Sequence, residues 1–341
     1  MGATKVSTSV CFIQHRSGSV KRVVGLSVMC LAAFFSASMV QAQGYPVKPV
    51  RLVVPYPPGG SADLLGRIVG QKLSESLGQQ VIIDNRGGAN GAIGADNVAK
   101  SPADGYSILL NTSSYTTNAA VQRKLPFDPV NDLAAVGMIA KGPLLIVVHP
   151  SMPVKTVREL ITLAKSKPDA LSYCSSGGGS IQHFATEMFL HATKTAMVHV
   201  PYKGMGPAVR DLVGGHVQVL IASFPSAYGQ VKVNRLRAIA VTSTERTSFA
   251  PELPTVSEAG VPGYLVELWW GLFVPGKSPV AVMMRLNAEL KKALEAKDIR
   301  GKIAAEGADP AAYSPAEFQK IVTEDIARWR SVADSRGIKA D

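Results

Sequence analysis

The sequence predicts an α/β protein with two lobes, and three observations support this. Short apolar runs alternate with amphipathic stretches from Pro49 onward, helix starts carry capping patterns, and the alternating series begins again near Leu144. Strands that alternate with helices imply right-handed crossovers and mostly parallel sheets. A chain of 341 residues, of which 46% are hydrophobic, can bury two cores, so we expect two sheets with one lobe built around each.

The predicted strands are short, apolar and mostly β-branched or aliphatic. They cover residues 51–54, 81–83, 107–110, 144–148, 198–200, 219–222 and 236–241. The predicted helix starts at residues 156–159 and 314–317 have a Thr or Ser three residues before a Glu, which is a capping box. Ser278 and Pro279 are expected to start a further helix, with the proline at its first position as in residues 314–315. This helix is expected to run to about residue 296.

The first 42 residues have the features of a cleaved secretory signal. Residues 1–22 contain four basic residues and no acidic one, and residues 23–40 form an apolar run. Val40 and Ala42 then occupy the small-residue positions of a cleavage site. An uncleaved membrane anchor is one alternative, because the run is about as long as the shortest spanning helices, and a lipid-modified Cys30 is another. We expect export with cleavage near Ala42.

The basic character of the chain does not by itself indicate nucleic-acid binding. The formal charge of +11, from 36 Lys and Arg against 25 Asp and Glu, falls to +7 when the first 42 residues are removed. The remaining basic residues are scattered along predicted helices with few aromatic residues between them, which is typical of solvated helix faces. Cleavage also removes two of the three cysteines, and Cys174 alone forms neither an intramolecular disulfide nor a Cys-based zinc site.

Four glycine-rich loops connect predicted strands to predicted helices, two in each half of the chain. They cover residues 55–63, 84–94, 174–180 and 201–207. In an open parallel sheet such loops lie at the carboxyl ends of the strands, where ligands bind. Glycine lets the backbone approach a ligand closely, and the first N–H groups of a helix have no partner within the helix and carry the positive end of its dipole. We therefore predict an anion site made of main chain, for a carboxylate or a phosphate. Tight turns with Ser61 and Ser180 as N-caps are the alternative for any single loop.

Motifs for other functions are absent or out of context. Residues 271–278 match the phosphate-binding loop, but residues 272–274 have the pattern of a strand, whereas the chemistry needs a flexible loop after a strand. There is no dinucleotide-binding G-x-G-x-x-G and no nucleophile-elbow G-x-S-x-G. Asp63 and Asp84 fit helix or strand ends better than an acid pair, and the histidines do not form a zinc motif. We expect no catalytic residue, no metal and no cofactor.

Several blocks of sequence together resemble one known family. They include the run from Tyr45 that ends in GGSAD at Asp63, the run NRGGANGAIG at residues 85–94, and further blocks at residues 98–106, 173–177, 200–204, 212–216, 237–246 and 253–263. In this order they resemble the substrate-binding family of tripartite tricarboxylate transporters, the Bug family of exported solute receptors. The resemblance covers nearly the whole chain after the signal.

The resemblance implies a type II periplasmic-binding-protein fold, in which two α/β lobes with mostly parallel sheets close on a ligand in the cleft between them. It implies a signal peptide over residues 1–42, a first lobe over residues 43–143, a second lobe over residues 144–262, and a return to the first lobe over residues 263–341. It also places the mature protein in the periplasm.

Family members typically hold a carboxylate with main-chain amides of the first two loops, often through ordered water, and the loops of the second lobe complete the site. Carried over to this chain, the resemblance implies the following ligand-binding residues: Tyr56, Pro57, Gly59, Gly60, Ser61, Asp63, Arg86, Gly88, Ala89, Asn90, Gly91, Ser175, Ser176, Ser180, His183, Tyr202 and Ser223. The usual Pro after Asn-Arg is Gly87 here, so we expect a more mobile second loop.

A second departure from the family bears on the ligand. Many members have an Asp near the end of the strand equivalent to residues 219–222, able to meet a ligand ammonium, where this chain has Ala222 and Ser223. We therefore expect a carboxylate without an amino group, such as a di- or tricarboxylate or an aromatic acid.

The leading hypothesis is a monomeric solute-binding protein that delivers this acid to membrane transporter subunits and has no nucleic-acid partner. Two alternatives stay open. One is a ligand-sensing periplasmic subunit that docks on a signalling receptor. The other is a hydrolase that uses Ser175 or Ser180 together with His183.

Overall fold

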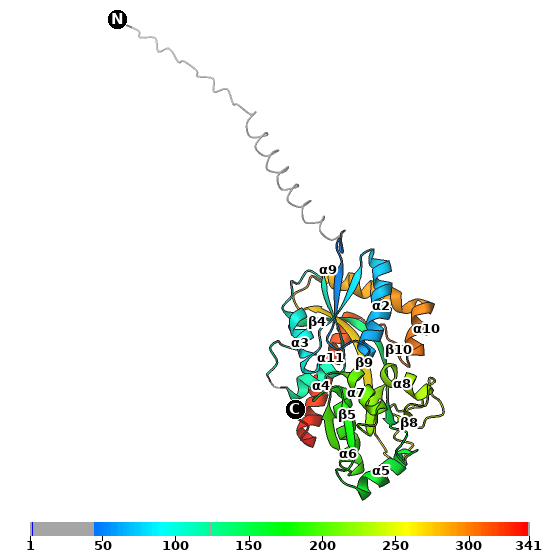
Figure 1. Ribbon diagram of the computed structural model, residues 1–341. Helices are drawn as coiled ribbons and strands as arrows, with labels where there is room; N and C mark the ends of the chain where they lie inside the picture. Colours follow the sequence, from blue (N-terminus) through cyan, green and yellow to red (C-terminus); the bar gives the residue numbers. More distant parts are fainter. Residues whose placement is uncertain (1, 3–43, 123, 340–341) are drawn as a thin grey trace. The chain divides into compact units, whose positions relative to one another are not determined.

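The computed structural model describes residue 2, residues 44–122 and residues 124–339 (Figure 1). The predicted signal peptide, apart from Gly2, lies outside the described residues. Residues 46–341 form one compact unit, to which everything below refers. Within the described part of the chain, no helix combines the length and apolar character needed to cross a membrane.

The described strands form a ten-stranded sheet in the order β2-β1-β3-β9-β4-β7-β5-β6, and β10 and β8 both pair with β4. The strands are β1 (Val50–Val54), β2 (Val81–Asn85), β3 (Ser107–Thr112), β4 (Leu133–Val148), β5 (Ser172–Ser175), β6 (Val198–Pro201), β7 (Val219–Ser223), β8 (Arg237–Val241), β9 (Glu267–Pro275) and β10 (Asp309–Pro310).

Helices lie between most of these strands. They are α2 (Ser61–Leu77), the short 3-10 turn η1 (Ala89–Gly91), α3 (Ala92–Ala99), α4 (Ser114–Val121), α5 (Val157–Ser166), α6 (Ile181–Thr193), α7 (Met205–Val213), α8 (Phe224–Lys232), α9 (Val280–Glu295), α10 (Lys297–Ala305) and α11 (Pro315–Arg336). Figure 1 shows α5, α6 and α7 grouped around β5, away from α2, α3 and α9.

Strand β4 divides the sheet into two halves. Its first part, up to Pro143, pairs with β9 and β10, and its last part, from Leu144, pairs with β7 and β8. We call β1, β2, β3, β9, β10 and the first part of β4, with the helices that pack on them, the first half. The second half contains β5 to β8, the end of β4, and α5 to α8. The C-terminal helices contact the first half, since α9 and α10 pack on α2 and α11 packs on α4.

The α/β fold class is confirmed, but the prediction of two mostly parallel sheets was wrong, because the described strands form one mixed sheet that β4 and β9 hold together. The pairings among β1, β2 and β3, and among β5, β6 and β7, are parallel as predicted. Every pairing of β4, and that of β9 with β3, is antiparallel. The alternating pattern predicts only the parallel units, because the two long antiparallel strands have no helix crossover to reveal them.

The predicted strands all form, usually with one or two added residues, and the strand at residues 272–274 is part of β9. The prediction that this strand starts at Leu144 was wrong, because β4 begins at Leu133. Gly137 and Gly142 obscure its pattern, and the pairing with β9 shifts register twice along this stretch. Partners distant in the sequence therefore stabilise it, and local propensity does not.

Two of the predicted helix starts form as capping boxes. Thr156 Oγ1 accepts a hydrogen bond from Glu159 N at 3.2 Å, and Ser314 Oγ accepts one from Glu317 N at 3.3 Å. The third differs by one residue, because Pro279 is itself the N-cap of α9 and its side chain offers no acceptor.

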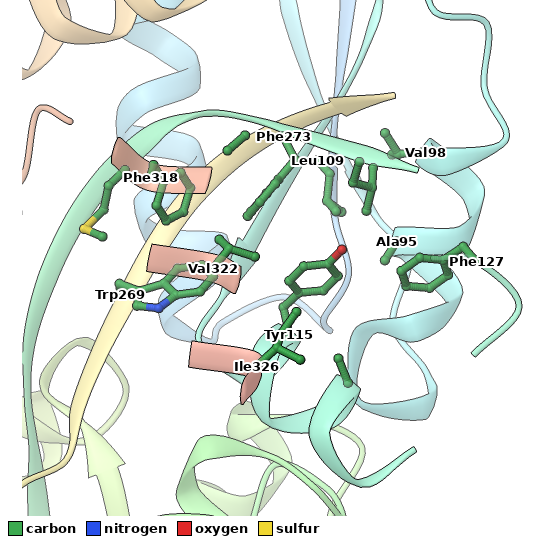
Figure 2. Close-up of a cluster of buried hydrophobic side chains, with 14 of the residues drawn as sticks. Ala95, Val98, Leu109, Tyr115, Phe127, Trp269, Phe273, Phe318, Val322 and Ile326 are labelled. Atoms are coloured by element: carbon green, nitrogen blue, oxygen red, sulfur yellow. The ribbon is translucent and has the colours of Figure 1, made fainter. Parts of the chain in front are cut away.

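A cluster of aromatic side chains joins β9 to α11 in the core of the first half (Figure 2). Phe318 on α11 packs edge-on to Trp269 with ring centroids 5.1 Å apart and lies 5.2 Å from Phe273. Between these two strand residues, Gly271 leaves the space that the Phe318 ring occupies. The close approach of α11 to the sheet therefore requires glycine at this position.

We expect Gly271→Ala to destabilise the protein by about 1–3 kcal/mol, because the new methyl group overlaps the ring of Phe318 in a packed core. Urea denaturation measures the free energy of unfolding. Gly301→Ala is the control, since Gly301 lies in α10 with no atom near its added methyl group, and alanine there raises helix stability by up to about 1 kcal/mol. Equal stability of Gly271→Ala and the wild type would contradict this account of the core.

Candidate functional site

Helix starts from both halves converge on one small cavity. This inner cavity has a volume of about 20 Å³, which is room for about one water molecule. It lies at the N-terminal ends of α2, α4, α6 and α7, and its lining residues are Tyr56, Gly60, Ser61, Ala62, Thr112, Ser114, Ser176, Gln182, Met205 and Leu268. Amide groups at helix starts therefore surround it on several sides.

A larger outer cavity of about 360 Å³ adjoins the inner one, because Tyr56 and Ser176 line both. Its other lining residues are Pro57, Gly88, Ala89, Asn90, Gly91, Gln122, Gly177, Gly178, Pro201, Tyr202, Lys203 and Gly204. Loops of both halves again contribute. We call the two cavities together the cleft.

Most of the residues predicted for ligand binding line this cleft. These are Tyr56, Pro57, Gly60, Ser61, Gly88, Ala89, Asn90, Gly91, Ser176 and Tyr202. The other predicted residues lie outside its lining: Gly59, Asp63, Arg86, Ser175, Ser180, His183 and Ser223. The structure therefore brings the four glycine-rich loops together and places part of the predicted set behind them.

The loop after β3 also lines the inner cavity, which the sequence did not predict. Thr112 and Ser114 line the inner cavity at the start of α4, although no glycine marks this loop. The available signal was a run of hydroxyl residues directly after a predicted strand. Leu268, on β9, also lines the cavity and has no local signal, because β9 reaches it only through its pairing with β3 and β4.

Asp63 holds the first loop in place from behind. Its carboxylate accepts hydrogen bonds from Gly59 N at 3.1 Å, Arg67 Nη2 at 2.9 Å and Asn85 Nδ2 at 3.1 Å. Burial alone would raise the pKa of this carboxyl, but the hydrogen bonds from Arg67, Gly59 and Asn85 outweigh it and lower the pKa below its usual value. Asp63 is therefore ionised and positions the loop.

Tyr56 supports the first and second loops together. Its buried hydroxyl donates to Asn111 Oδ1 at 2.9 Å, and burial raises the pKa of Tyr56 to about 12, so the group is neutral. Gly91, with φ of 91°, packs over this hydroxyl, and a Cβ there would lie 3.1 Å from it. The second loop therefore requires glycine at this point.

The two halves are hydrogen-bonded to one another at two helix starts. Ser61 N, the first amide of α2, donates to Ser226 Oγ at 3.3 Å, and Ile181 N, the first amide of α6, donates to Ser114 Oγ at 3.2 Å. Ser223 Oγ lies 2.8 Å from Ser226 Oγ, so Ser223 supports this contact from outside the lining. Each of these amides has an acceptor from the opposite half, which shows that the helix starts attract acceptors across the cleft.

The predicted residues Ser175, Ser180 and His183 shape the third loop from behind. Ser175 is fully buried, and its Oγ lies 2.7 Å from His199 Nε2. Ser180 Oγ caps α6 by accepting from His183 N at 3.3 Å, and His183 Nδ1 accepts from Gly179 N at 3.1 Å. None of the three lines the cleft, so neither serine is presented there as a nucleophile.

The side chains that line the two cavities carry little charge. Among the lining residues that the structure describes, Lys203 in the outer cavity is basic and none is Asp or Glu. The free thiol of Cys174 is buried behind the third loop, and burial raises its pKa to about 12. The cleft thus favours anions through amides and one cation.

A mixed α/β fold with a cleft between two halves, lined by helix starts, is the architecture of periplasmic solute-binding proteins. Solved structures of this class superimpose well on the chain. One, titled "R. palustris Rpa4515 with adipate", is 38% identical with a TM-score of 0.85 and covers 86% of this chain and 99% of its own. Another, MatC from Rhodopseudomonas palustris with bound malate, is 30% identical with a TM-score of 0.81 and covers 84% and 99%.

The family follows from sequence. Residues 65–338 match the model of the tripartite tricarboxylate transporter family receptor, and the chain belongs to this family. It is also 34% identical over 323 residues to Protein BugT of Bordetella pertussis, which corresponds to 94% of this chain and 99% of BugT. The resemblance inferred from sequence is thereby confirmed.

We expect Asp63→Asn to lower the free energy of unfolding at pH 7 by about 1.5–3 kcal/mol, because hydrogen bonds to a charged group are lost. The pKa of Asp63 is lower in the folded than in the unfolded state, so its contribution is present above an unfolded pKa near 4 and is lost as the pH falls through the folded pKa. The difference between variant and wild type should therefore shrink at about pH 3.

Urea denaturation at both pH values tests this. Asp169→Asn is the control, since Asp169 is exposed at a turn with φ of 56°, which asparagine tolerates, and it should change stability at neither pH. A difference for Asp63→Asn that stays the same at both pH values would contradict the role assigned to its charge.

Proposed function

We propose that the protein is a periplasmic solute-binding protein that captures a small carboxylate by closure of the cleft and delivers it to a tripartite tricarboxylate-type membrane transporter. The observation that carries this proposal is the convergence of helix starts from both halves on one cavity. Amides at helix starts, which have no partner within their own helix, suit a carboxylate without a balancing cation. Similar proteins bound to adipate and malate support a carboxylate as the ligand class.

The small volume of the inner cavity supports closure of the cleft around the ligand. The inner cavity of about 20 Å³ is too small to admit a carboxylic acid from solvent in this arrangement. A ligand therefore enters when the halves are apart, and its contacts to both halves favour the closed state. We propose that residues 43–143 and 263–341 form one lobe and residues 144–262 the other, which the change of partners along β4 after Pro143 supports.

Both halves of the cleft belong to one chain, so a monomer suffices for this role. We further propose that the ligand lacks an amino group. Ala222 and Ser223 are fully buried behind the cleft, and the described lining residues include no carboxylate that would meet an ammonium. With Ser175 buried and Ser180 serving as a cap, we propose binding without catalysis.

We expect the mature chain to bind dicarboxylates more tightly than their amino analogues. Calorimetry with succinate against aspartate, and adipate against 2-aminoadipate, should show at least about tenfold weaker binding of the amino acid, because its ammonium is desolvated without a partner. Citrate and benzoate extend the panel to tricarboxylates and aromatic acids. Tighter binding of aspartate than of succinate would refute the expected ligand class, and no binding of any acid would refute the proposed function.

We expect Gly60→Phe to abolish ligand binding without unfolding the protein. Gly60 has φ of −87°, which any residue adopts, and a Cβ there would lie 3.8 Å from Met205 Cβ across the inner cavity. The ring would fill the space between the halves, so affinity should fall by about 100-fold or more, while the melting temperature changes by roughly 2–4 °C.

The matched control is Gly301→Phe, at a helix position with open space around it. It should keep the wild-type affinity. If Gly60→Phe binds the same acid as well as the wild type does, the ligand site lies elsewhere.

A further inference from the structure

Two histidine rings are stacked directly behind the third glycine-rich loop, residues 174–180. His183 from α6 lies nearly parallel to His199 from β6, with ring centroids 4.2 Å apart and 10° between the ring planes. Tyr173 from β5 stacks on His199 with centroids 4.8 Å apart. His183 and Tyr173 are buried. We call these three rings the histidine stack, and it joins three elements of the second half behind one loop of the cleft.

His183 can hold the loop only in its neutral form. Gly179 N donates a hydrogen bond to His183 Nδ1 at 3.1 Å, and both groups are buried. The accepting nitrogen of an imidazole carries no proton, whereas an imidazolium has an N–H at both positions and offers no acceptor. Protonation at Nδ1 therefore breaks this hydrogen bond and sets two buried N–H groups against one another.

His199 is bonded in a way that does not depend on its charge. Its Nε2 lies 2.7 Å from Ser175 Oγ, which also accepts from Gly177 N and donates to Gly177 O, each at 3.1 Å. All three contacts are satisfied when Nε2 donates, as it can in the neutral and in the protonated ring. The parallel arrangement also disfavours charge on both rings together. His183 is therefore the pH-sensitive member of the stack.

Other charged groups near the stack come from α6 and α11. Glu187, one turn further along α6, accepts a hydrogen bond from the Tyr173 hydroxyl at 2.6 Å. Glu187 also lines a cavity of about 260 Å³ with His191 of α6 and Arg336 of α11. The α4 residues beside the third loop and the residues of β7 are uncharged. Within this set, His183 both belongs to a residue type that titrates near neutral pH and accepts a hydrogen bond from the loop.

The loop that His183 holds belongs to the wall of the cleft. Ser176, Gly177 and Gly178 line the outer cavity, and Ser176 lines the inner cavity as well. Gly179, the next residue, is the one bonded to the ring. A change at this amide is therefore transmitted along one to three residues of backbone to the lining of both cavities.

We propose that His183 is a positioning residue that makes ligand binding depend on pH. In its neutral form it holds the third loop in the arrangement that binds the ligand, and uptake of a proton releases the loop and with it the ligand. The inference rests on the proposed function, since it assumes that a carboxylic acid occupies the cleft. It adds that protons and ligand compete, so that binding expels a proton and acidification favours release.

Calorimetry with succinate, adipate, citrate and benzoate at pH 7.5 and pH 5.5 tests this. An acid that binds the wild type should bind roughly tenfold more weakly at pH 5.5, since one linked proton changes affinity by at most tenfold per pH unit. Near pH 6, heats measured in two buffers of different ionisation enthalpy should show release of about half a proton for each acid bound. The buffer comparison needs no substitution, so it stands if a variant fails to fold.

His183→Asn is the decisive variant, because its amide oxygen can accept from Gly179 N but does not titrate. It should bind at pH 7.5 nearly as well as the wild type and lose the pH dependence, apart from the titration of the acid itself, which affects both proteins alike. His191→Asn is the matched control, since His191 lies exposed on the same helix and outside the cleft. It should keep the pH dependence of the wild type.

Two results would overturn the assignment while the proposed function stands. One is a wild type whose affinity for a bound acid is the same at both pH values and which releases no proton. The other is a His183→Asn variant that keeps the pH dependence of the wild type. Failure of all four acids to bind at either pH would overturn the proposed function as well.

Discussion

The constraint on which the rest of the structure depends is the set of amides at the helix starts that have no partner within their own helices. Parallel strands followed directly by helices bring these amides to one edge of the sheet, and each buried amide must find an acceptor. The structure meets this demand across the cleft, where Ser226 and Ser114 accept from the first amides of α2 and α6. The same demand explains the glycine-rich loops, the contact between the halves and the preference for an anionic ligand.

Strands β4 and β9 determine how the two halves are joined, and they mark the limit of prediction from local sequence. The parallel units and the capping boxes at Thr156 and Ser314 are local features, so short windows of sequence reveal them. The first part of β4 is a strand because β9, more than a hundred residues later, pairs with it. Its glycines weaken the local pattern, and Gly271 on β9 is explained only by the ring of Phe318 from a third segment.

The candidate site likewise has features that the local sequence predicts and features that only the folded chain determines. Glycine-rich loops are visible in sequence, and the structure places residues of all four of them in the lining of the cleft. Which residue of a loop faces the cleft depends on backbone direction, so Ser176 lines it while the adjacent Ser175 is buried against His199. Asp63 is of a residue type that is common in binding sites, but its carboxylate accepts hydrogen bonds from Arg67, Asn85 and the amide of Gly59. Thr112 and Ser114 were missed because a hydroxyl-rich loop without glycine carries a weaker signal.

Recognition by main chain also limits which ligands the amides of the cleft can distinguish. An amide at a helix start is the same whichever residue carries it, so such amides favour an acceptor such as a carboxylate but do not read the rest of the molecule. Discrimination between acids must come from side chains, and both cavities supply them: Ser114 and Gln182 line the inner cavity, and Lys203 and Tyr202 line the outer one. The hydroxyl of Tyr202 donates a hydrogen bond to Asp211 Oδ2 at 2.6 Å. If the cleft holds the ligand as proposed, the amides of the helix starts provide the common affinity for an acceptor, and side chains of both cavities must discriminate between ligands.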